Sequence, residues 1–125
     1  MRLGRHGFTL IELLVVLVIV AGLISIVTPR YLRSLEQSEE VMLVSNLTNM
    51  RDVLDQFYAD RGIRPSELLE LVDAGYIRNV PQDPMTKSSM SWIIVNSEDA
   101  GVPGIADIRS GADGETRSGI PFSEL

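Results

Sequence analysis

One carboxylate occupies an otherwise apolar stretch near the start of the chain. Residues 8–27 are apolar apart from Thr9, Glu12 and Ser25. A carboxylate in an apolar medium costs on the order of a few kcal/mol at the centre of a bilayer and less near its surface. Such a group is normally paired, and residues 8–27 contain no cationic side chain. The chemistry expected of Glu12 is therefore ion pairing with a chain terminus or with another molecule.

The side chains that most enzymes use for catalysis are scarce. The chain has no cysteine, which excludes disulfides, thiolate nucleophiles and thiolate metal sites, and its one histidine is His6. Carboxylate pairs such as Asp52 and Asp55 remain, but their helical spacing is typical of a solvated helix face. We therefore predict that the protein is not an enzyme.

The element that carries Glu12 is a helix long enough to cross a bilayer. Twenty helical residues rise about 30 Å, which matches the hydrocarbon thickness. A secretory signal peptide is one alternative, because Arg2 and Arg5 form a basic region before the apolar core. Against it, no small-x-small cleavage site follows this core, which also exceeds the usual length of roughly 7–15 residues. A buried helix of a soluble domain is the other alternative, but β-branched residues facing every direction would need a far larger protein around them.

The sequence GFTLIE at residues 7–12 follows a basic leader and precedes an uninterrupted apolar run. It resembles the processing site of the type IV pilin and type II secretion pseudopilin superfamily, in which a prepilin peptidase cuts after the glycine and methylates the new N-terminal residue. The resemblance implies cleavage between Gly7 and Phe8, N-methylation of Phe8, and a role in assembly for Glu12. It also implies a cytoplasmic leader (residues 1–7), a helix spanning the bacterial inner membrane (8–28), and a periplasmic domain (29–125).

Cleavage after Gly7 would create the missing partner of Glu12. The new α-amino group of Phe8 has an ordinary pKa of about 8, so it is largely cationic, and methylation keeps it basic. Phe8 and Glu12 lie four residues apart on one helical face. The amine can therefore meet Glu12 of its own chain or of a neighbour displaced along a filament axis. Pairing between chains neutralises a charge in the apolar core and sets the axial register.

The helix is predicted to continue beyond the apolar segment and to become amphipathic. Gly22 and Pro29 weaken it, and we expect a kink or a locally melted turn at Pro29, because proline lacks the N–H and clashes with the preceding turn. Arg51 and several acids form a polar face further on, and Gly62 should end the helix. The opposite face, predicted to pack on the rest of the domain, comprises Leu43, Leu47, Met50, Leu54 and Phe57, broadened by Val53 and Tyr58.

The remainder of the chain is too small to form a robust core without that helix. A short helix is predicted over residues 65–74, with proline near its first turn and Gly75 after its end. Residues 90–95 and 105–109 predict two strands, joined through the glycines and proline of 101–104. The expected fold class is α+β and pilin-like: a long N-terminal helix, membrane-spanning in its first half and amphipathic in its second, packs on a short helix and a small antiparallel sheet.

Four motifs follow one another in the C-terminal part: GYI at 75–77, VPQDP at 80–84, Trp92 and SGADG at 110–114. Their order is similar to that in one branch of the superfamily, the major pseudopilins of type II secretion. In that branch the C-terminal loop binds calcium through aspartates and backbone carbonyls, and Asp113 matches one such aspartate. Calcium takes about six to eight oxygen ligands, but no aspartate follows Asp113 in this chain. A turn at Asp113 that needs no metal is the alternative.

Charge separates the remaining functions. Without Arg2 and Arg5 the chain has nine basic and 17 acidic residues, a net charge of about −8. Such a surface repels nucleic acid, whose binding rests on neutralising phosphates. The predicted function is that of a structural subunit of a pseudopilus-like filament in type II secretion-like export across the outer membrane. Its partners would be further copies of itself, other pseudopilins, the prepilin peptidase, the inner-membrane assembly platform and membrane lipid.

Two other functions remain as alternatives. One is a type IV pilus subunit acting in adhesion or motility, and the other is a solitary membrane-anchored binding module. The absence of cysteine favours the pseudopilin over the pilus subunit, because many pilus subunits carry a C-terminal disulfide loop. An intact leader on the mature protein would favour the binding module.

Overall fold

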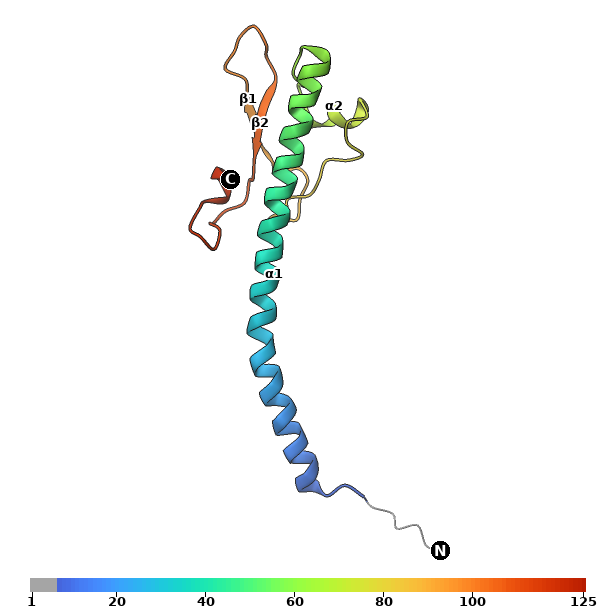
Figure 1. The fold of residues 1–125 in the computed structure, drawn as a ribbon, viewed down its shortest axis with the longest axis vertical. Helices are drawn as coiled ribbons and strands as arrows, with labels where there is room; N and C mark the ends of the chain where they lie inside the picture. The colour runs from blue at the N-terminus through green and yellow to red at the C-terminus, as the bar shows by residue number, and fades with distance from the viewer. Residues whose placement is uncertain (1–6) are drawn as a thin grey trace, which may run out of the picture. The chain divides into compact units, whose positions relative to one another are not determined.

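The computed structural model describes residues 7–125, so His6 and the predicted leader, apart from Gly7, lie outside the described part of the chain. Two helices, two strands and a 3₁₀ helix follow one another along it (Figure 1). They are α1 (Leu10–Arg61), α2 (Leu68–Asp73), β1 (Ile93–Asn96), β2 (Ile105–Arg109) and η1 (Phe122–Glu124). The chain divides into two compact units: unit 1 ends at Glu36, within α1, and unit 2 comprises Gln37–Leu125.

Unit 1 has no hydrophobic core of its own in its described part. All side chains of residues 7–36 are exposed, including the apolar ones. By length and composition the helix could cross a membrane, and none of its most apolar stretch is buried. Because apolar residues face all directions around the helix, no single side of unit 1 is suited to packing on a folded domain.

The helix is continuous through Gly22 and Pro29. The hydroxyl groups of Ser25 and Thr28 each donate a hydrogen bond of 2.8 Å to the carbonyl four residues earlier. Side chains that bond back in this way often accompany bends in helices. Regular helix continues on both sides of Pro29, so the melted turn expected there is absent from the described helix. The kink at Gly22 and Pro29 stays a prediction.

In unit 2 the same helix buries one face. The five residues of the predicted stripe are each at most 1% exposed, so that prediction is confirmed. Val53 packs against the core as expected, whereas Tyr58 is exposed and its ring faces the guanidinium of Arg64. The core combines the stripe with one residue of α2, two of β2 and two aromatic side chains: Leu43, Leu47, Met50, Leu54, Phe57, Leu71, Ile105, Ile108, Trp92 and Phe122.

Helix α1 ends and α2 begins at positions set by backbone hydrogen bonds. Gly62 follows the last residue of α1 with φ of +67° and donates to the carbonyl of Tyr58, so the predicted end is confirmed. Helix α2 begins three residues later than predicted, because the carbonyl of Pro65 accepts a hydrogen bond from Ile105 and Glu67 is extended. Its C-terminus is closed by Gly75, which has φ of +81°. Figure 1 shows α2 and the sheet flanking this part of α1.

The two strands form one antiparallel sheet in which Ile94 lies opposite Ile108. Strand β2 has the predicted bounds and points Ile105 and Ile108 into the core. Strand β1 begins three residues later than predicted. The reason is that the indole of Trp92 turns inward to donate to the carbonyl of Pro81 at 2.8 Å, and the residues before it form hydroxyl-bonded turns. The helices and sheet together confirm the α+β, pilin-like fold.

Candidate functional site

The helix N-terminus forms a reciprocal hydrogen-bonded cap around Glu12. The backbone N–H of Thr9 donates to Glu12 Oε2 at 3.3 Å, and the N–H of Glu12 donates to Thr9 Oγ1 at 3.2 Å. This arrangement is a capping box, which satisfies two donors that the first helical turn leaves open. No role is predicted above for Thr9, although a threonine three residues before a glutamate is the usual signal for such a cap. In the single chain, Glu12 is therefore oriented by Thr9.

The peptide bond between Gly7 and Phe8 lies outside the helix. Helix α1 begins at Leu10, Phe8 is 87% exposed, and the space where a Cβ of Gly7 would lie is empty. An exposed, non-helical bond next to a glycine is open to an enzyme that must reach the backbone. The structure thus brings the accessible bond, Phe8 and the capped Glu12 together at one end of the helix.

The surface that follows Glu12 is unusually apolar. Large apolar side chains from Leu13 to Val27 are 45–61% exposed, apart from Val18, which is 70% exposed. Contiguous apolar surface of this size on a folded chain marks contact with a membrane or with other chains. Gly22 lies within this segment and Pro29 two residues after it, and nothing in the described chain beyond the helix itself lies within 4 Å of a Cβ at Gly22. Unit 1 therefore needs lipid or protein around it.

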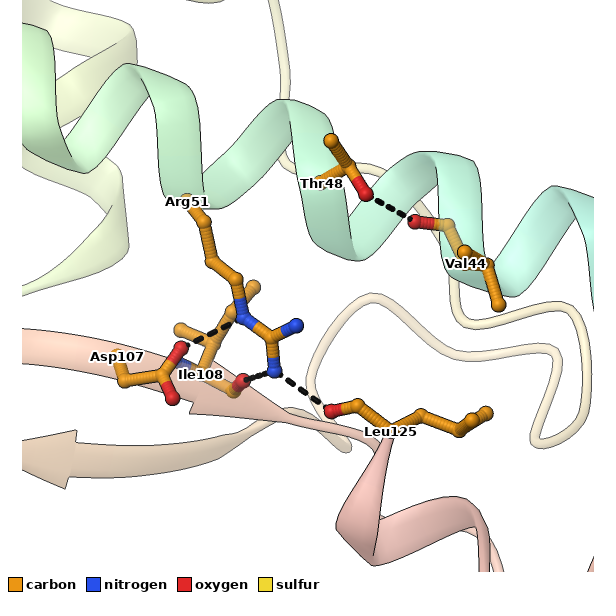
Figure 2. Close-up of polar contacts among 6 residues, drawn as sticks. All are labelled: Val44, Thr48, Arg51, Asp107, Ile108 and Leu125. Carbon is orange, nitrogen blue, oxygen red and sulfur yellow. Dashed lines mark hydrogen bonds and ion pairs between the residues drawn. The ribbon is translucent and has the colours of Figure 1, made fainter. Parts of the chain in front are cut away.

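In unit 2 a cluster of hydrogen bonds centred on Arg51 connects α1 to the C-terminal part of the chain (Figure 2). Arg51 Nε donates to Asp107 Oδ1 at 2.7 Å, and Nη2 donates to the carbonyl of Ile108 at 3.0 Å and to the oxygen of Leu125 at 2.7 Å. One planar guanidinium thus ties the helix to β2 and to the end of the C-terminal segment. The sequence placed Arg51 on a solvated face, and no local pattern shows its partners, which lie 56 or more residues away.

A second cluster of hydrogen bonds is centred on the buried carboxylate of Asp83. This side chain is 0% exposed, and it accepts hydrogen bonds from Ser110 Oγ at 2.5 Å and from the N–H of Met85 at 2.8 Å. Ser110 is also fully buried and follows the last residue of β2. The bonds join the 81–88 loop to the start of the C-terminal segment. The VPQDP motif was noted in the sequence without a role for its aspartate.

The calcium candidate Asp113 is exposed and lies beside a tight turn at Gly114, which has φ of +98°. Within residues 7–125 no group of three or more His, Cys, Asp or Glu side chains is gathered closely enough to hold a metal ion. The loop from Gly114 to Phe122 is closed by a hydrogen bond from the N–H of Phe122 to the carbonyl of Gly114 at 3.1 Å. These residues do not form the set of oxygens that calcium prefers, and the calcium site stays a prediction.

The beginning of the chain matches a known family model. Residues 2–28 match the model described as the prokaryotic N-terminal methylation motif. The matched residues include Gly7, Phe8 and Glu12, together with the whole of the apolar segment 8–27. The match supports the interpretation of this end as a processing and methylation site.

Curated proteins similar to this chain share one description, type II secretion system core protein G. The protein from Klebsiella pneumoniae is 34% identical over 96 residues, which cover 64% of this chain and 69% of that protein. The one from Escherichia coli (strain K12) is 29% identical over 127 residues, covering 89% of this chain and 84% of that protein. The one from Aeromonas hydrophila is 31% identical over 96 residues, covering 64% and 67% respectively. No solved structure matches the chain.

Proposed function

Because this chain belongs to the family of type II secretion system core protein G, we propose that it is a structural subunit of a pseudopilus acting in type II secretion-like protein export. The observation that carries this proposal is the combination, at one end of α1, of the methylation motif, the capped Glu12 and an exposed apolar helix. The role is structural and needs no catalytic site. The description shared by the relatives favours it over a type IV pilus subunit and over a solitary membrane-anchored binding module.

The first step of the proposed function is processing. A prepilin peptidase cleaves the bond between Gly7 and Phe8 and methylates the new amine. The exposure of Phe8 and the empty space around Gly7 support this step, because the peptidase must approach the backbone closely. Residues 1–7 are thereby removed from the mature subunit.

The second step is the exchange of one partner of Glu12 for another. Before assembly, the backbone N–H of Thr9 occupies one oxygen of the Glu12 carboxylate at 3.3 Å. In the filament, the cationic amine of Phe8 on a neighbouring copy pairs with Glu12, because a charge–charge contact in an apolar medium is stronger than a contact with a neutral N–H. The pairing displaces neighbouring helices by four residues, or about 6 Å along the axis.

The proposed surroundings follow from the exposed apolar surface. Before assembly, the segment 8–28 spans the inner membrane with the leader on the cytoplasmic side and residues 29–125 in the periplasm. During assembly, the same apolar side chains exchange lipid for the helices of other copies and of other pseudopilins, delivered by the inner-membrane assembly platform. Each apolar side chain of unit 1 is then covered in both states.

Intact-mass spectrometry of protein from cells that contain the peptidase tests the processing. The expected mass is that of residues 8–125 plus one methyl group. Gly7→Ala should leave a larger fraction uncleaved, because the added methyl group obstructs the approach to the backbone. Mature protein that retains residues 1–7 in such cells would contradict the proposal.

Cysteine crosslinking tests the filament, and the chain suits it because it has no cysteine of its own. A displacement of four residues brings position 16 of one copy level with position 20 of the next. Co-expressed copies carrying Val16→Cys and Val20→Cys should form disulfide-linked dimers more readily than either variant alone. Equal crosslinking in all three samples would exclude the proposed register.

A further inference from the structure

A hollow of about 320 Å³ lies in unit 2, between the segment that follows α1 and the loop that joins the two strands. Ile63, Arg64 and Ser66 line it from the first segment, and Val102 and Pro103 line it from the loop. It is separate from Thr9, Glu12 and every other residue used in the proposed function. Its walls are mostly apolar, with one cationic side chain among them.

The walls of this hollow are held in place by the backbone. A Cβ added to Gly104 would lie 2.8 Å from Arg64 Cβ and 2.8 Å from the carbonyl oxygen of Pro65, so the strand loop packs directly on the segment after α1. The N–H of Ile105 donates to that same carbonyl at 2.8 Å. Gly104 has φ of +125°, a conformation that favours glycine. The two segments that form the walls are therefore fixed relative to each other by backbone contacts.

Arg64 lacks the partners that arginine normally has. Its Nε is buried without a hydrogen-bond acceptor, and no other side-chain nitrogen or oxygen in residues 7–125 is buried in this state. Arg64 makes no ion pair with any carboxylate of the described chain, in contrast to Arg51. Its guanidinium instead lies over the ring of Tyr58, 4.6 Å from the centroid. A buried donor without a partner requires a physical explanation.

We propose that this hollow binds a carboxylate through Arg64, and that the ligand is an acidic side chain beside an apolar side chain on a partner protein. A guanidinium binds carboxylates through two parallel hydrogen bonds, and a small movement off the Tyr58 ring would open Nε as well as the terminal nitrogens. The apolar walls formed by Ile63, Val102 and Pro103 would take the neighbouring apolar side chain. The chain is acidic as a whole, so affinity would come from these direct contacts.

A pair of matched peptides tests this assignment on the full processed chain in detergent micelles. The probe is acetyl-Leu-Glu-Leu-amide, and its neutral control is acetyl-Leu-Gln-Leu-amide. Nuclear magnetic resonance should show a shift of the Arg64 Nε–H signal with the first peptide and none with the second. Acetate at the same concentrations measures what the carboxylate contributes without the apolar neighbours.

Variants with matched charge complete the test. Arg64→Gln should weaken binding of the Glu peptide by about tenfold or more, and Arg64→Lys should weaken it less, because the charge is kept and the planar fork is lost. Arg61→Gln should change binding by less than about twofold, because Arg61 lies over Phe57 and Tyr76 and does not line this hollow. The fluorescence of Trp92, which lies in the core, reports whether each variant is folded.

Three results would overturn the proposal. They are equal affinity for the two peptides, unchanged binding by a folded Arg64→Gln protein, and no binding by the unmodified protein at millimolar peptide. Acetate binding as tight as that of the Glu peptide would overturn the assignment to an acidic peptide, because the apolar walls would then contribute nothing. None of these results bears on processing or filament assembly, so the two proposals fail independently.

Discussion

Both halves of helix α1 are rich in apolar side chains, yet only the second half buries them within its own chain. In the described part of unit 1, residues 7–36, the apolar residues face every direction and all remain exposed. In unit 2 they recur at three- and four-residue spacing, and the stripe from Leu43 to Phe57 is almost completely buried. The difference is one of pattern as much as of composition, because a single apolar face can be covered by one small domain and a fully apolar helix cannot.

Because of this difference, we expect the apolar residues of unit 2 to determine the stability of the subunit and those of unit 1 to determine its association with other copies. The apolar residues of unit 2 contribute to the free energy of unfolding of the isolated subunit, since their partners belong to the same chain. The apolar residues of unit 1 have no partners within the described part of the subunit, so they contribute to stability only when lipid or another copy covers them. The same kind of substitution in the two units should therefore have different consequences.

The largest effect is expected from Glu12→Leu. The substitution removes the desolvation cost of a carboxylate, so membrane insertion should be kept or improved, while filament assembly should be abolished because the neighbouring Phe8 amine loses its partner. Shearing and crosslinking assays measure assembly. The fluorescence of Trp92 should remain that of the unmodified protein.

Glu12→Gln separates the charge from the cap. Glutamine can still accept the hydrogen bond from the Thr9 backbone, because capping boxes use either residue. If the ionic pair with Phe8 drives assembly, this variant should fail as severely as the leucine variant. Filaments at the normal yield would show that the cap is sufficient and would exclude the charge pairing.

The next largest effect is expected from a matched pair of leucine substitutions. Leu54→Ala should lower the free energy of unfolding of unit 2 by about 2–5 kcal/mol, because Leu54 is 1% exposed and its loss leaves a cavity. Leu14→Ala should leave that free energy unchanged, because Leu14 is 54% exposed and lies in unit 1. Denaturant unfolding followed by Trp92 fluorescence measures both. Similar losses in both variants would contradict the separation of the two units.

A smaller loss, about 1–3 kcal/mol, is expected from Arg51→Met. The apolar part of the side chain is kept, but the carbonyl of Ile108 and the oxygen of Leu125 lose the guanidinium as donor, and Asp107 keeps only the N–H of Ile108. The value should fall toward the low end of the range, because the Arg51 and Asp107 side chains are about one third exposed and the ion pair is partly screened by water. Arg117→Met is the control, since Arg117 is exposed and contributes its backbone N–H to Glu40. Equal free energies of unfolding of the two variants would refute the claim that the hydrogen bonds of Arg51 stabilise unit 2.

The smallest effects are expected at the C-terminal turn. Gly114→Val should cost about 1–2 kcal/mol, because the residue must keep a positive φ. A calcium chelator should leave the melting temperature unchanged, since Asp113 lies in no gathered set of ligands within the described chain. Thermal unfolding with and without chelator measures this. A large shift that Asp113→Ala removes would establish a calcium site and overturn the expectation.

Features that depend on residues close together in the sequence were predictable. The length of the apolar segment and the buried stripe each follow from spacing along one helix, whose geometry repeats every few residues. The end of α1 at Gly62 and the bounds of β2 follow from local turn and strand preferences. The proposed processing site at Gly7 and Phe8 came from the resemblance of the GFTLIE motif to the pilin superfamily, whereas Glu12 was first singled out as the one carboxylate in an apolar segment.

Other features were decided by distant parts of the chain. Helix α2 begins late because the carbonyl of Pro65 bonds to Ile105, and β1 begins late because Trp92 turns toward Pro81. These bonds join residues that no short sequence window contains. Local preference alone therefore placed the elements correctly, but not the first residues of α2 and β1.

The polar contacts that secure the C-terminal segment show the same limit most clearly. Arg51 has the spacing of a solvated helix face, and only the return of β2 and the C-terminus to α1 brings it its acceptors. Asp83 and Ser110 likewise meet across 27 residues. The pattern of apolar residues along α1 was enough to show which half of the helix needs partners from outside the chain. Which polar side chains meet inside unit 2, and that Arg64 is left without a partner beside a hollow, was decided by the tertiary structure, because long-range pairing depends on where the chain returns.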